Sequence, residues 1–308
     1  MKRIAVGEGS CGIAAGAAKV YSALEEALKG RDIKLGIVGC IGMCYLEPIV
    51  DIYEDGELIK RLVQVSEADA EKIAKALAED DLSALDSLTI RDEDINFLSR
   101  QTRIALRNCG IIDPEDIKAY MEKGGYKGLR KVLESMSQDD VIEEIKTSGL
   151  AGRGGAGFPT WFKWNAAKNS VGNGSKYLIC NADEGDPGAF MDRAVIESDP
   201  HNLIEGMMIG AYAIGATEAV VYVRAEYPLA IVRLEKAIEQ ARAEGMLGKN
   251  ICGSGFSCDM RIKAGAGAFV CGEETALIES LEGKRGMPRL KPPFPAQKGY
   301  NQEPSNIN

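Results

Sequence analysis

Strand-like and helix-like segments alternate along the chain from residue 151 onward. Short apolar runs occur at 177–181, 219–224 and 259–263. Each is followed by a longer segment with helical apolar spacing, at 203–216, 227–244 and 273–281. Strands that alternate with helices form parallel sheets covered by helices on both faces. The pattern predicts a three-layer, Rossmann-like α/β domain over residues 151–308.

The first 80 residues predict a smaller domain of a different kind. Their elements follow the order β-α-β-β-β-α, with the helices at 13–29 and ending near 78 and strand-length runs at 3–6, 34–38, 49–53 and 58–63. The turn signal Glu54-Asp55-Gly56 joins the last two strands, and Ser66 with Asp69 marks the start of the last helix. We expect a thioredoxin-like, ferredoxin-type domain at 1–80.

Residues 81–150 are polar and contain several helix signals. Asp113 and Pro114 predict a helix start, with Asp113 as the N-cap and Pro114 at the first helical position. Gly124 and Gly125 break the next helix, and short helices are expected at 129–136 and 139–145. This part is interpreted as a helical connector between the two domains.

The charge and cysteine content narrow the functional classes. The formal net charge of −9 argues against nucleic acid and anionic membrane as main partners. No apolar run reaches the roughly 18 residues that a membrane-spanning helix requires, so we expect no membrane insertion and an intracellular location. In such a chain, eight cysteines are expected to be thiols or metal ligands rather than disulfides.

A glycine-rich segment opens the predicted α/β domain. Gly152, Gly154, Gly155 and Gly157 fall within six residues, and Lys163 follows them. Glycine lets the backbone approach a ligand closely and present N–H groups to phosphate. Because the preceding residues look helical, the segment does not fit the strand–glycine–helix fingerprint of dinucleotide-binding folds, and we interpret it as a loop folded over a ligand. A tight turn without a ligand is the alternative.

Two clusters of acidic residues follow in the same domain. The first comes directly after the 177–181 strand, where open α/β sheets bind ligands, and consists of Asn181, Asp183, Glu184 and Asp186. The second, at Gly272, Glu273 and Glu274, opens a helix. The alternatives are a solvated acidic loop and simple stabilisation of the helix dipole. With the glycine loop, the clusters indicate a pocket for a nucleotide-like cofactor with a phosphate end and a polar end.

Three cysteines in the first domain form a candidate metal site. Cys40 and Cys44 are spaced C-x3-C, and Cys11 lies upstream at the head of a helix. Thiolates hold iron–sulfur clusters, which normally take four ligands, and this segment offers three. Ordinary thiols are the alternative. Thiol–disulfide chemistry is disfavoured, because three residues rather than two separate Cys40 from Cys44.

These motifs resemble those of a known family. The segments SGLAGRGGAGFPTWFKW, YLICNADEGDPGAF, PHNLIEGM and GAGAFVCGEETALIESLEGKRGMPRLKPPFPA, with the final PSNIN, are similar to the NADH-binding flavoprotein subunit of respiratory complex I. The same subunit type occurs in NAD(P)-linked and electron-bifurcating hydrogenases and in formate dehydrogenases. The resemblance covers essentially the whole chain, since the thioredoxin-like segment is typical of the hydrogenase-type members.

The resemblance implies an NAD(P)H dehydrogenase module that binds FMN and NAD(H) in one α/β domain. Hydride transfer would occur between NAD(H) and FMN, and electrons would pass singly to iron–sulfur clusters of partner subunits. The implied location is the cytoplasm or the cytoplasmic side of a membrane complex. Whether the cofactor is NADH or NADPH stays open, although acidic residues near the ribose favour NADH.

The resemblance also implies the roles of individual residues. The residues carried over to the FMN site are Gly152, Arg153, Gly154, Gly155, Gly157, Lys163, Asn181, Asp183, Gly185, Gly272, Glu273 and Asn308. Phe158 and Phe294 would stack on the adenine side of NADH. The nicotinamide and ribose would be oriented by Glu184, Asp186, Glu274 and Lys291. Glu184 and Glu274 are the implied catalytic residues, because their negative charge would tune the flavin potential.

The chain departs from the family pattern at several positions. Phe269, in the implied cofactor site, stands where a tyrosine is frequent, and Ala166 stands where an aromatic residue is frequent. Val6 occupies the position of the first cysteine of a 2Fe–2S site otherwise formed by Cys11, Cys40 and Cys44. Family members continue beyond the position of Asn308 into a ubiquitin-like domain and a helical domain with a 4Fe–4S cluster, so we expect a truncated chain or a missing part supplied by another chain. A non-catalytic scaffold that bridges redox partners is the alternative function.

Overall fold

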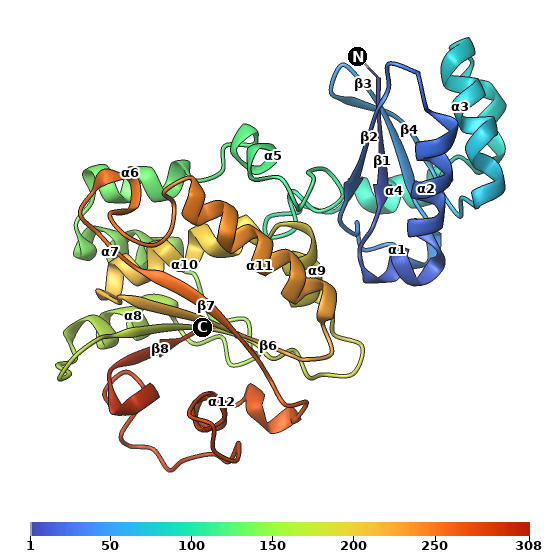
Figure 1. Cartoon of the computed structure of the whole chain (residues 1–308). Coiled ribbons are helices and arrows are strands. Elements are labelled where there is room, and N and C mark those ends of the chain that lie inside the picture. Colours follow the sequence, from blue (N-terminus) through green and yellow to red (C-terminus); the bar gives the residue numbers. More distant parts are fainter. Residues whose placement is uncertain (1) are drawn as a thin grey trace. The chain divides into compact units, whose positions relative to one another are not determined.

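The computed structural model describes residues 2–308 and separates into two units, each built around its own four-stranded sheet (Figure 1). The first unit runs to Ala119 and includes Ala194–Asp199. The second comprises Tyr120–Arg193 and Pro200–Asn308. Within residues 2–308, no helix has both the length and the apolar composition needed to cross a membrane.

The sheet of the first unit has the strand order β2-β1-β3-β4. Its strands are β1 (Lys2–Gly7), β2 (Lys34–Val38), β3 (Val50–Glu54) and β4 (Glu57–Leu62). β2 runs parallel to β1, whereas β3 and β4 form an antiparallel hairpin beside β1. Asp55 and Gly56 turn this hairpin with φ values of 49° and 88°, as a type I′ turn requires. The expected order of elements is confirmed, and the topology is thioredoxin-like.

The helix expected at 13–29 is broken into two. α1 (Ser10–Ala15) and α2 (Ala17–Ala27) meet at Gly16, whose φ of 106° is readily adopted only by glycine. Before α3 (Ala70–Glu79), Ser66 and Asp69 form the expected capping box, in which the Ser66 backbone N–H donates to the Asp69 carboxylate over 2.9 Å. Helix α4 (Asp92–Ser99) follows in this unit and lies within the segment 81–150 that was interpreted as the connector.

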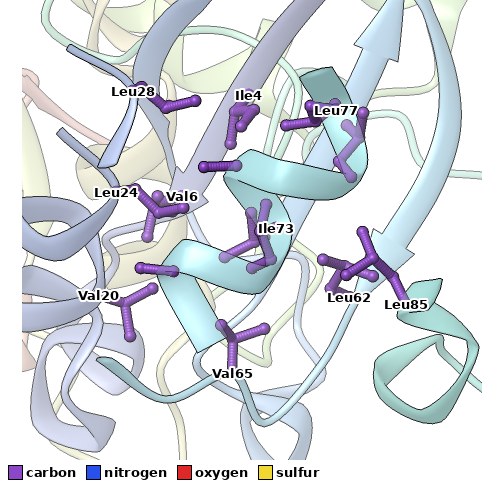
Figure 2. Packing of buried hydrophobic residues seen from close by; sticks show 14 of the residues in the cluster. Ile4, Val6, Val20, Leu24, Leu28, Leu62, Val65, Ile73, Leu77 and Leu85 are labelled. Carbon is purple, nitrogen blue, oxygen red and sulfur yellow. The ribbon is translucent and has the colours of Figure 1, made fainter. Parts of the chain in front are cut away.

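The apolar side chains of α2 and α3 meet those of the sheet in one core (Figure 2). Its buried members include Ile4, Val6, Val20, Leu24, Ile73 and Leu77. Val6 is fully buried among them, so its side chain is directed into the hydrophobic core. The segment Ala194–Asp199 is anchored in the same unit, where Glu197 accepts a hydrogen bond from the Ser10 backbone N–H over 2.9 Å.

Helices α5 (Ile117–Glu122), α6 (Lys127–Ser135) and α7 (Gln138–Ser148) follow along the chain. The helix start expected at Asp113 and Pro114 is wrong, because α5 begins at Ile117. The Asp113 carboxylate accepts a hydrogen bond from the Glu115 backbone N–H over 2.9 Å and forms a turn instead. Asp116, directly before α5, accepts from the Lys118 N–H over 2.9 Å. The expected break at Gly124 and Gly125 is confirmed.

The sheet of the second unit is parallel throughout and has the order β7-β6-β5-β8. Its strands are β5 (Tyr177–Ala182), β6 (Glu218–Val223), β7 (Asp259–Ala264) and β8 (Ser305–Ile307). Its remaining helices are α8 (Thr160–Asn169), α10 (Pro200–Ile214), α11 (Pro228–Ala243) and α12 (Glu274–Leu281). Helix α9 (Met191–Ser198) is divided between the two units, because Ala194–Asp199 belong to the first. α10 and α11 lie on one face and α12 on the other, which confirms the expected three-layer α/β arrangement (Figure 1).

The final segment adds a strand that the sequence pattern did not predict. Ser305–Ile307 add a fourth strand beside β5, with Ile307 paired to Ile179. Ile307 is buried and packs in the core that α12 covers, and this burial favours the short strand. Helices α8 and α9 were not expected either.

Candidate flavin and dinucleotide site

The carboxyl ends of the four parallel strands lie at one edge of the second sheet, and most of the expected site residues follow them. Asn181, Asp183 and Glu184 stand at or after the end of β5, and Asn308 follows β8. The loop after β7 leads to Gly272 and α12. This is the edge where open α/β sheets bind ligands.

A hydrogen-bonded cluster joins these strand ends. The Asn181 backbone N–H donates to the Asn308 carbonyl over 2.7 Å, which ties the end of β5 to the end of β8. The Asn181 side-chain amide donates to the Gly272 carbonyl over 2.8 Å, and its oxygen accepts from the Asp183 N–H over 3.1 Å. A Cβ at Gly272 would lie 3.4 Å from the Asp183 carbonyl oxygen, so the two loops pack closely.

The Asp183 carboxylate carries an open hydrogen-bonding position. Its Oδ2 is buried and has no hydrogen-bond partner among residues 2–308. Burial raises the pKa of Asp183, although the Arg224 guanidinium opposes that rise. A buried acceptor without a partner is costly, so a ligand N–H group placed here would relieve that cost.

Glu184 lies at the start of α9 rather than pointing freely into a pocket. Its carboxylate accepts hydrogen bonds from the backbone N–H groups of Asp192 over 3.1 Å and Arg193 over 3.2 Å, and from the Tyr227 hydroxyl over 3.2 Å. Arg224 donates to the Glu184 carbonyl over 2.5 Å. The sequence analysis missed Arg224 and Tyr227, although their place at the end of the 219–224 run and shortly after it could have indicated them.

Two lysines and two glutamates form a chain of charges beside α12. Glu273 caps this helix by accepting from the backbone N–H groups of Thr275 over 2.8 Å and Ala276 over 3.0 Å. Lys291 lies 3.2 Å from the Glu273 carboxylate and 2.9 Å from that of Glu274. The other Glu274 oxygen lies 3.8 Å from Lys163.

Lys163 connects this chain of charges to the end of β8. Its ammonium, carried by α8, donates to the Ile307 carbonyl. Burial lowers the pKa of Lys163, and the Glu274 carboxylate opposes that change. The structure therefore brings together Lys163, Glu273, Glu274 and Lys291, as the predicted site requires.

The glycine loop forms a closed, exposed turn before α8. Ala151 pairs with Pro159, and the Gly152 N–H donates to the Phe158 carbonyl over 2.8 Å. Gly155 and Gly157 have φ values of 95° and 60°, and a Cβ at either would meet nothing within 4 Å. Backbone conformation, rather than crowding within the chain, therefore selects glycine at these positions.

The remaining expected residues lie in exposed positions. Arg153 and Asp186 are exposed, and so are the rings of Phe158, Phe269 and Phe294. Phe158 contacts Phe162 edge to face, with centroids 5.6 Å apart. Gly185 lies against Phe269: a Cβ there would come within 2.6 Å of the ring.

The three cysteines of the first unit converge, as expected. The sulfur of Cys11 lies 3.2 Å from that of Cys40, which lies 3.9 Å from that of Cys44. Their ligand atoms all lie within 4.8 Å of one another. Three thiols at such distances can ligate a metal.

The second unit fits a flavin nucleotide on the chemistry of its own groups. The open Asp183 oxygen can accept from a ring N–H, while the unencumbered glycine turn and Lys163 offer donors to a phosphate. The side chains meet these needs from different elements around one edge of the sheet.

Comparison with known proteins identifies the same segment. The family of the Nuo51 FMN-binding domain matches residues 145–307. Over 209 residues the chain is 62% identical to the "NADP-reducing hydrogenase subunit HndC" of Solidesulfovibrio fructosivorans, in an alignment that covers 68% of this chain and 42% of the relative. Over 192 residues it is 56% identical to an NADH-quinone oxidoreductase subunit of Aquifex aeolicus, covering 62% and 44%. The chain thus spans less than half the length of these relatives.

One solved structure is similar to this chain over more of its length than the sequence relatives are. The structure of an "NAD+-reducing [NiFe]-hydrogenase in the air-oxidized state" is similar with a TM-score of 0.54 and 29% identity, and the alignment covers 100% of this chain and 50% of that one. Both units of this chain therefore have counterparts in a single larger polypeptide chain.

Proposed function

The chain belongs to the family of the Nuo51 FMN-binding domain, and we propose that its second unit holds the FMN and NAD(H) site of an NADH dehydrogenase flavoprotein. The observation that carries this proposal is the position of the matched motifs. Their residues come from three segments, Asn181 and Asp183 at the end of β5, Gly272 before α12 and Lys163 on α8, and they meet at the carboxyl edge of the parallel sheet.

The chain's own residues would bind and position the two cofactors. Backbone N–H groups of the glycine turn and the Lys163 ammonium would hold the phosphate, and Asp183 Oδ2 would accept a ring N–H. FMN, when bound, supplies the ring that accepts a hydride from the nicotinamide and releases electrons singly. No side chain has to act as a general base in such a transfer, because positioning supplies the protein's part of the catalysis.

The acidic groups would influence the redox potential of the flavin and the choice between NADH and NADPH. Glu184 and Glu274 place negative charge beside the proposed ring site, which favours the more oxidised, less negative flavin. The same acidic surroundings disfavour a 2′-phosphate, so we expect NADH to be preferred over NADPH. The names of the relatives point both ways, since one is called NADP-reducing and another NADH-quinone oxidoreductase.

The proposed electron acceptors are iron–sulfur clusters of partner subunits in a hydrogenase, formate dehydrogenase or complex I type of assembly. The 2Fe–2S cluster predicted from the sequence at Cys11, Cys40 and Cys44 is one of two possible occupants of these thiols, the other being a single metal ion, and iron and sulfide analysis of the purified chain distinguishes them. A 4Fe–4S cluster beyond the matched region stays a prediction. Residues that orient the nicotinamide and adenine, including Asp186, Phe158 and Phe294, are proposed on the resemblance alone.

FMN binding to the full 308-residue chain tests the site. FMN fluorescence titrations would compare Lys163→Met with Lys168→Met, because both lysines lie on α8 and Lys168 pairs with the exposed Asp139. A charge-assisted contact to phosphate contributes about 1.5–3 kcal/mol, so Lys163→Met should weaken FMN binding roughly 10- to 100-fold. Lys168→Met should bind like the unaltered chain. Equal affinities for the two variants would remove Lys163 from the site, and a chain that binds no FMN would favour the scaffold alternative.

A further inference from the structure

The three thiols of the first unit are arranged closely enough to surround one metal ion. Cys11 lies at the start of α1, and Cys40 and Cys44 lie in the loop after β2. With metal–sulfur bonds of about 2.3 Å, two thiolates of a tetrahedral site lie roughly 3.8 Å apart. The sulfur–sulfur distances of 3.2 Å from Cys11 to Cys40 and 3.9 Å from Cys40 to Cys44 bracket that value. A two-iron cluster would instead divide its ligands between two metal ions.

Glu47 lies beside the Cys11 thiol and offers a fourth ligand from outside the group of three cysteines, whose ligand atoms alone all lie within 4.8 Å of one another. It is only 7% exposed, although its side chain is ionisable. Its Oε2 accepts a hydrogen bond from the Ile49 N–H over 3.0 Å, and its Oε1 lies 3.9 Å from the Cys11 sulfur. A tetrahedral ion with sulfur at about 2.3 Å and oxygen at about 2.1 Å places these two ligand atoms roughly 3.6 Å apart.

The backbone around β1 and α1 leaves room for these two groups. A Cβ at Gly7 would lie 3.1 Å from a Glu47 carboxylate oxygen, and one at Gly12 would lie 3.1 Å from the same oxygen and 2.1 Å from the Gly7 carbonyl oxygen. A Cβ at Gly9 would lie 3.0 Å from the Cβ of Cys40. The absence of side chains at these three positions therefore lets the Cys11 segment close over Glu47 and Cys40.

We propose that Cys11, Cys40 and Cys44 hold one tetrahedral divalent ion of the zinc class, and that the Glu47 carboxylate turns from its place beside Cys11 to complete a closed, four-ligand site. The Gly42 N–H donates to the Cys40 sulfur over 3.2 Å, which is the kind of outer contact that orients a thiolate ligand. Val6 cannot supply a further ligand because its aliphatic side chain has no donor atom, and it packs in the hydrophobic core (Figure 2). Such a site ties the α1 segment to the loop after β2 and carries no electrons, because zinc has no redox chemistry.

Metal content and affinity of the full chain test this assignment. The protein would be stripped of metal under reducing conditions and titrated with Zn²⁺ against a chromophoric chelator, with Co²⁺ as a spectroscopic substitute. We expect one Zn²⁺ per chain and, with Co²⁺, the intense visible bands of a tetrahedral thiolate site. Glu47→Gln should lower Zn²⁺ affinity at least 10- to 100-fold, which is the loss produced by removing an outer-contact partner alone.

The matched control is Glu54→Gln, because Glu54 is exposed at the end of β3 in the same unit. It should bind Zn²⁺ like the unaltered chain. If Glu47→Gln does not fold by circular dichroism, Glu47→Cys decides the matter, since a fourth thiolate should retain one tightly bound Zn²⁺. Equal Zn²⁺ affinities for folded Glu47→Gln and Glu54→Gln would overturn the proposal. Loss of Zn²⁺ binding in Glu47→Cys, or two irons with two sulfides per purified chain, would do the same.

Discussion

Replacing Glu184 by glutamine removes one of the two carboxylate oxygens that hold the start of α9. In the unaltered chain, these oxygens accept from the N–H groups of Asp192 and Arg193 and from the Tyr227 hydroxyl. The glutamine oxygen can replace Oε2, which serves Arg193 and Tyr227. Its NH₂ group would then face the Asp192 N–H, so two donors would meet.

The expected cost follows from these three contacts. A hydrogen bond to a charged acceptor contributes about 1.5–3 kcal/mol, and one to a neutral acceptor about 0.5–1.5 kcal/mol. The three bonds are long, at 3.1–3.2 Å, so the lower ends of both ranges apply, and one lost bond with two bonds that lose their charge amounts to roughly 3.5 kcal/mol. The charge of Glu184 also helps to raise the pKa of Asp192, behind the larger effect of burial, and its removal returns part of this cost. The free energy of unfolding of the second unit should therefore fall by about 2 kcal/mol.

Tryptophan fluorescence reports on this unit because both tryptophans of the chain, Trp161 and Trp164, lie on α8. In a domain of this size, a loss of about 2 kcal/mol lowers the melting temperature by roughly 4–8 °C. The control is Glu226→Gln, because the Glu226 side chain is 45% exposed and its pair with Arg224, at 3.1 Å, contributes little. If Glu184→Gln and Glu226→Gln unfold alike, then Glu184 does not hold α9.

Three further outcomes are expected. Burial, together with the charge of Glu184, raises the pKa of Asp192 to about 6. Between about pH 4 and 6 the folded chain therefore holds a proton that the unfolded chain has lost, and the free energy of unfolding falls as the pH rises through that window. Denaturation measured at several pH values should show that Asp192→Asn lacks this loss of stability. At pH 7 the variant should be more stable than the unaltered chain by up to about 3 kcal/mol. Ser66→Ala breaks the capping box with Asp69 and should destabilise the first unit by about 1 kcal/mol, seen as a lower melting temperature by circular dichroism. An unchanged melting temperature would show that the cap is dispensable. Gly155→Ala forces a φ of 95° on alanine at a cost of about 1–2 kcal/mol, so FMN titration should show weaker binding, and unchanged binding would place the ligand elsewhere.

The sequence predicted the elements whose periodic pattern is long or whose turn chemistry is specific. The β3–β4 hairpin and the Ser66 cap depend on neighbouring residues, and both are present as expected. β8 could not be expected in the same way, because three residues carry no periodic signal and its formation depends on pairing with β5, far away in the sequence. The start of α5 was misplaced because Asp113 forms a local turn and Asp116 lies directly before the helix.

The candidate site was predictable in its residue types but not in its connections. Glycines and carboxylates after strands indicated a ligand site, and the three-dimensional fold shows which of them meet. Glu184 was expected to face a cofactor, which stays a prediction, and the sequence did not indicate that its carboxylate also holds the start of α9, a helix that was not predicted. Glu47 was overlooked because one glutamate shortly after Cys44 has no distinguishing pattern. Its meaning comes from burial and from glycines far earlier in the chain.

The proposed hydride transfer is tested most directly by anaerobic titration of the FMN-loaded chain with NADH, followed by flavin absorbance. Loss of the flavin bands at one NADH per bound FMN, with slower loss on adding NADPH, is the result that the account predicts. A chain that binds FMN stoichiometrically and keeps its full flavin absorbance in excess NADH and excess NADPH would contradict it.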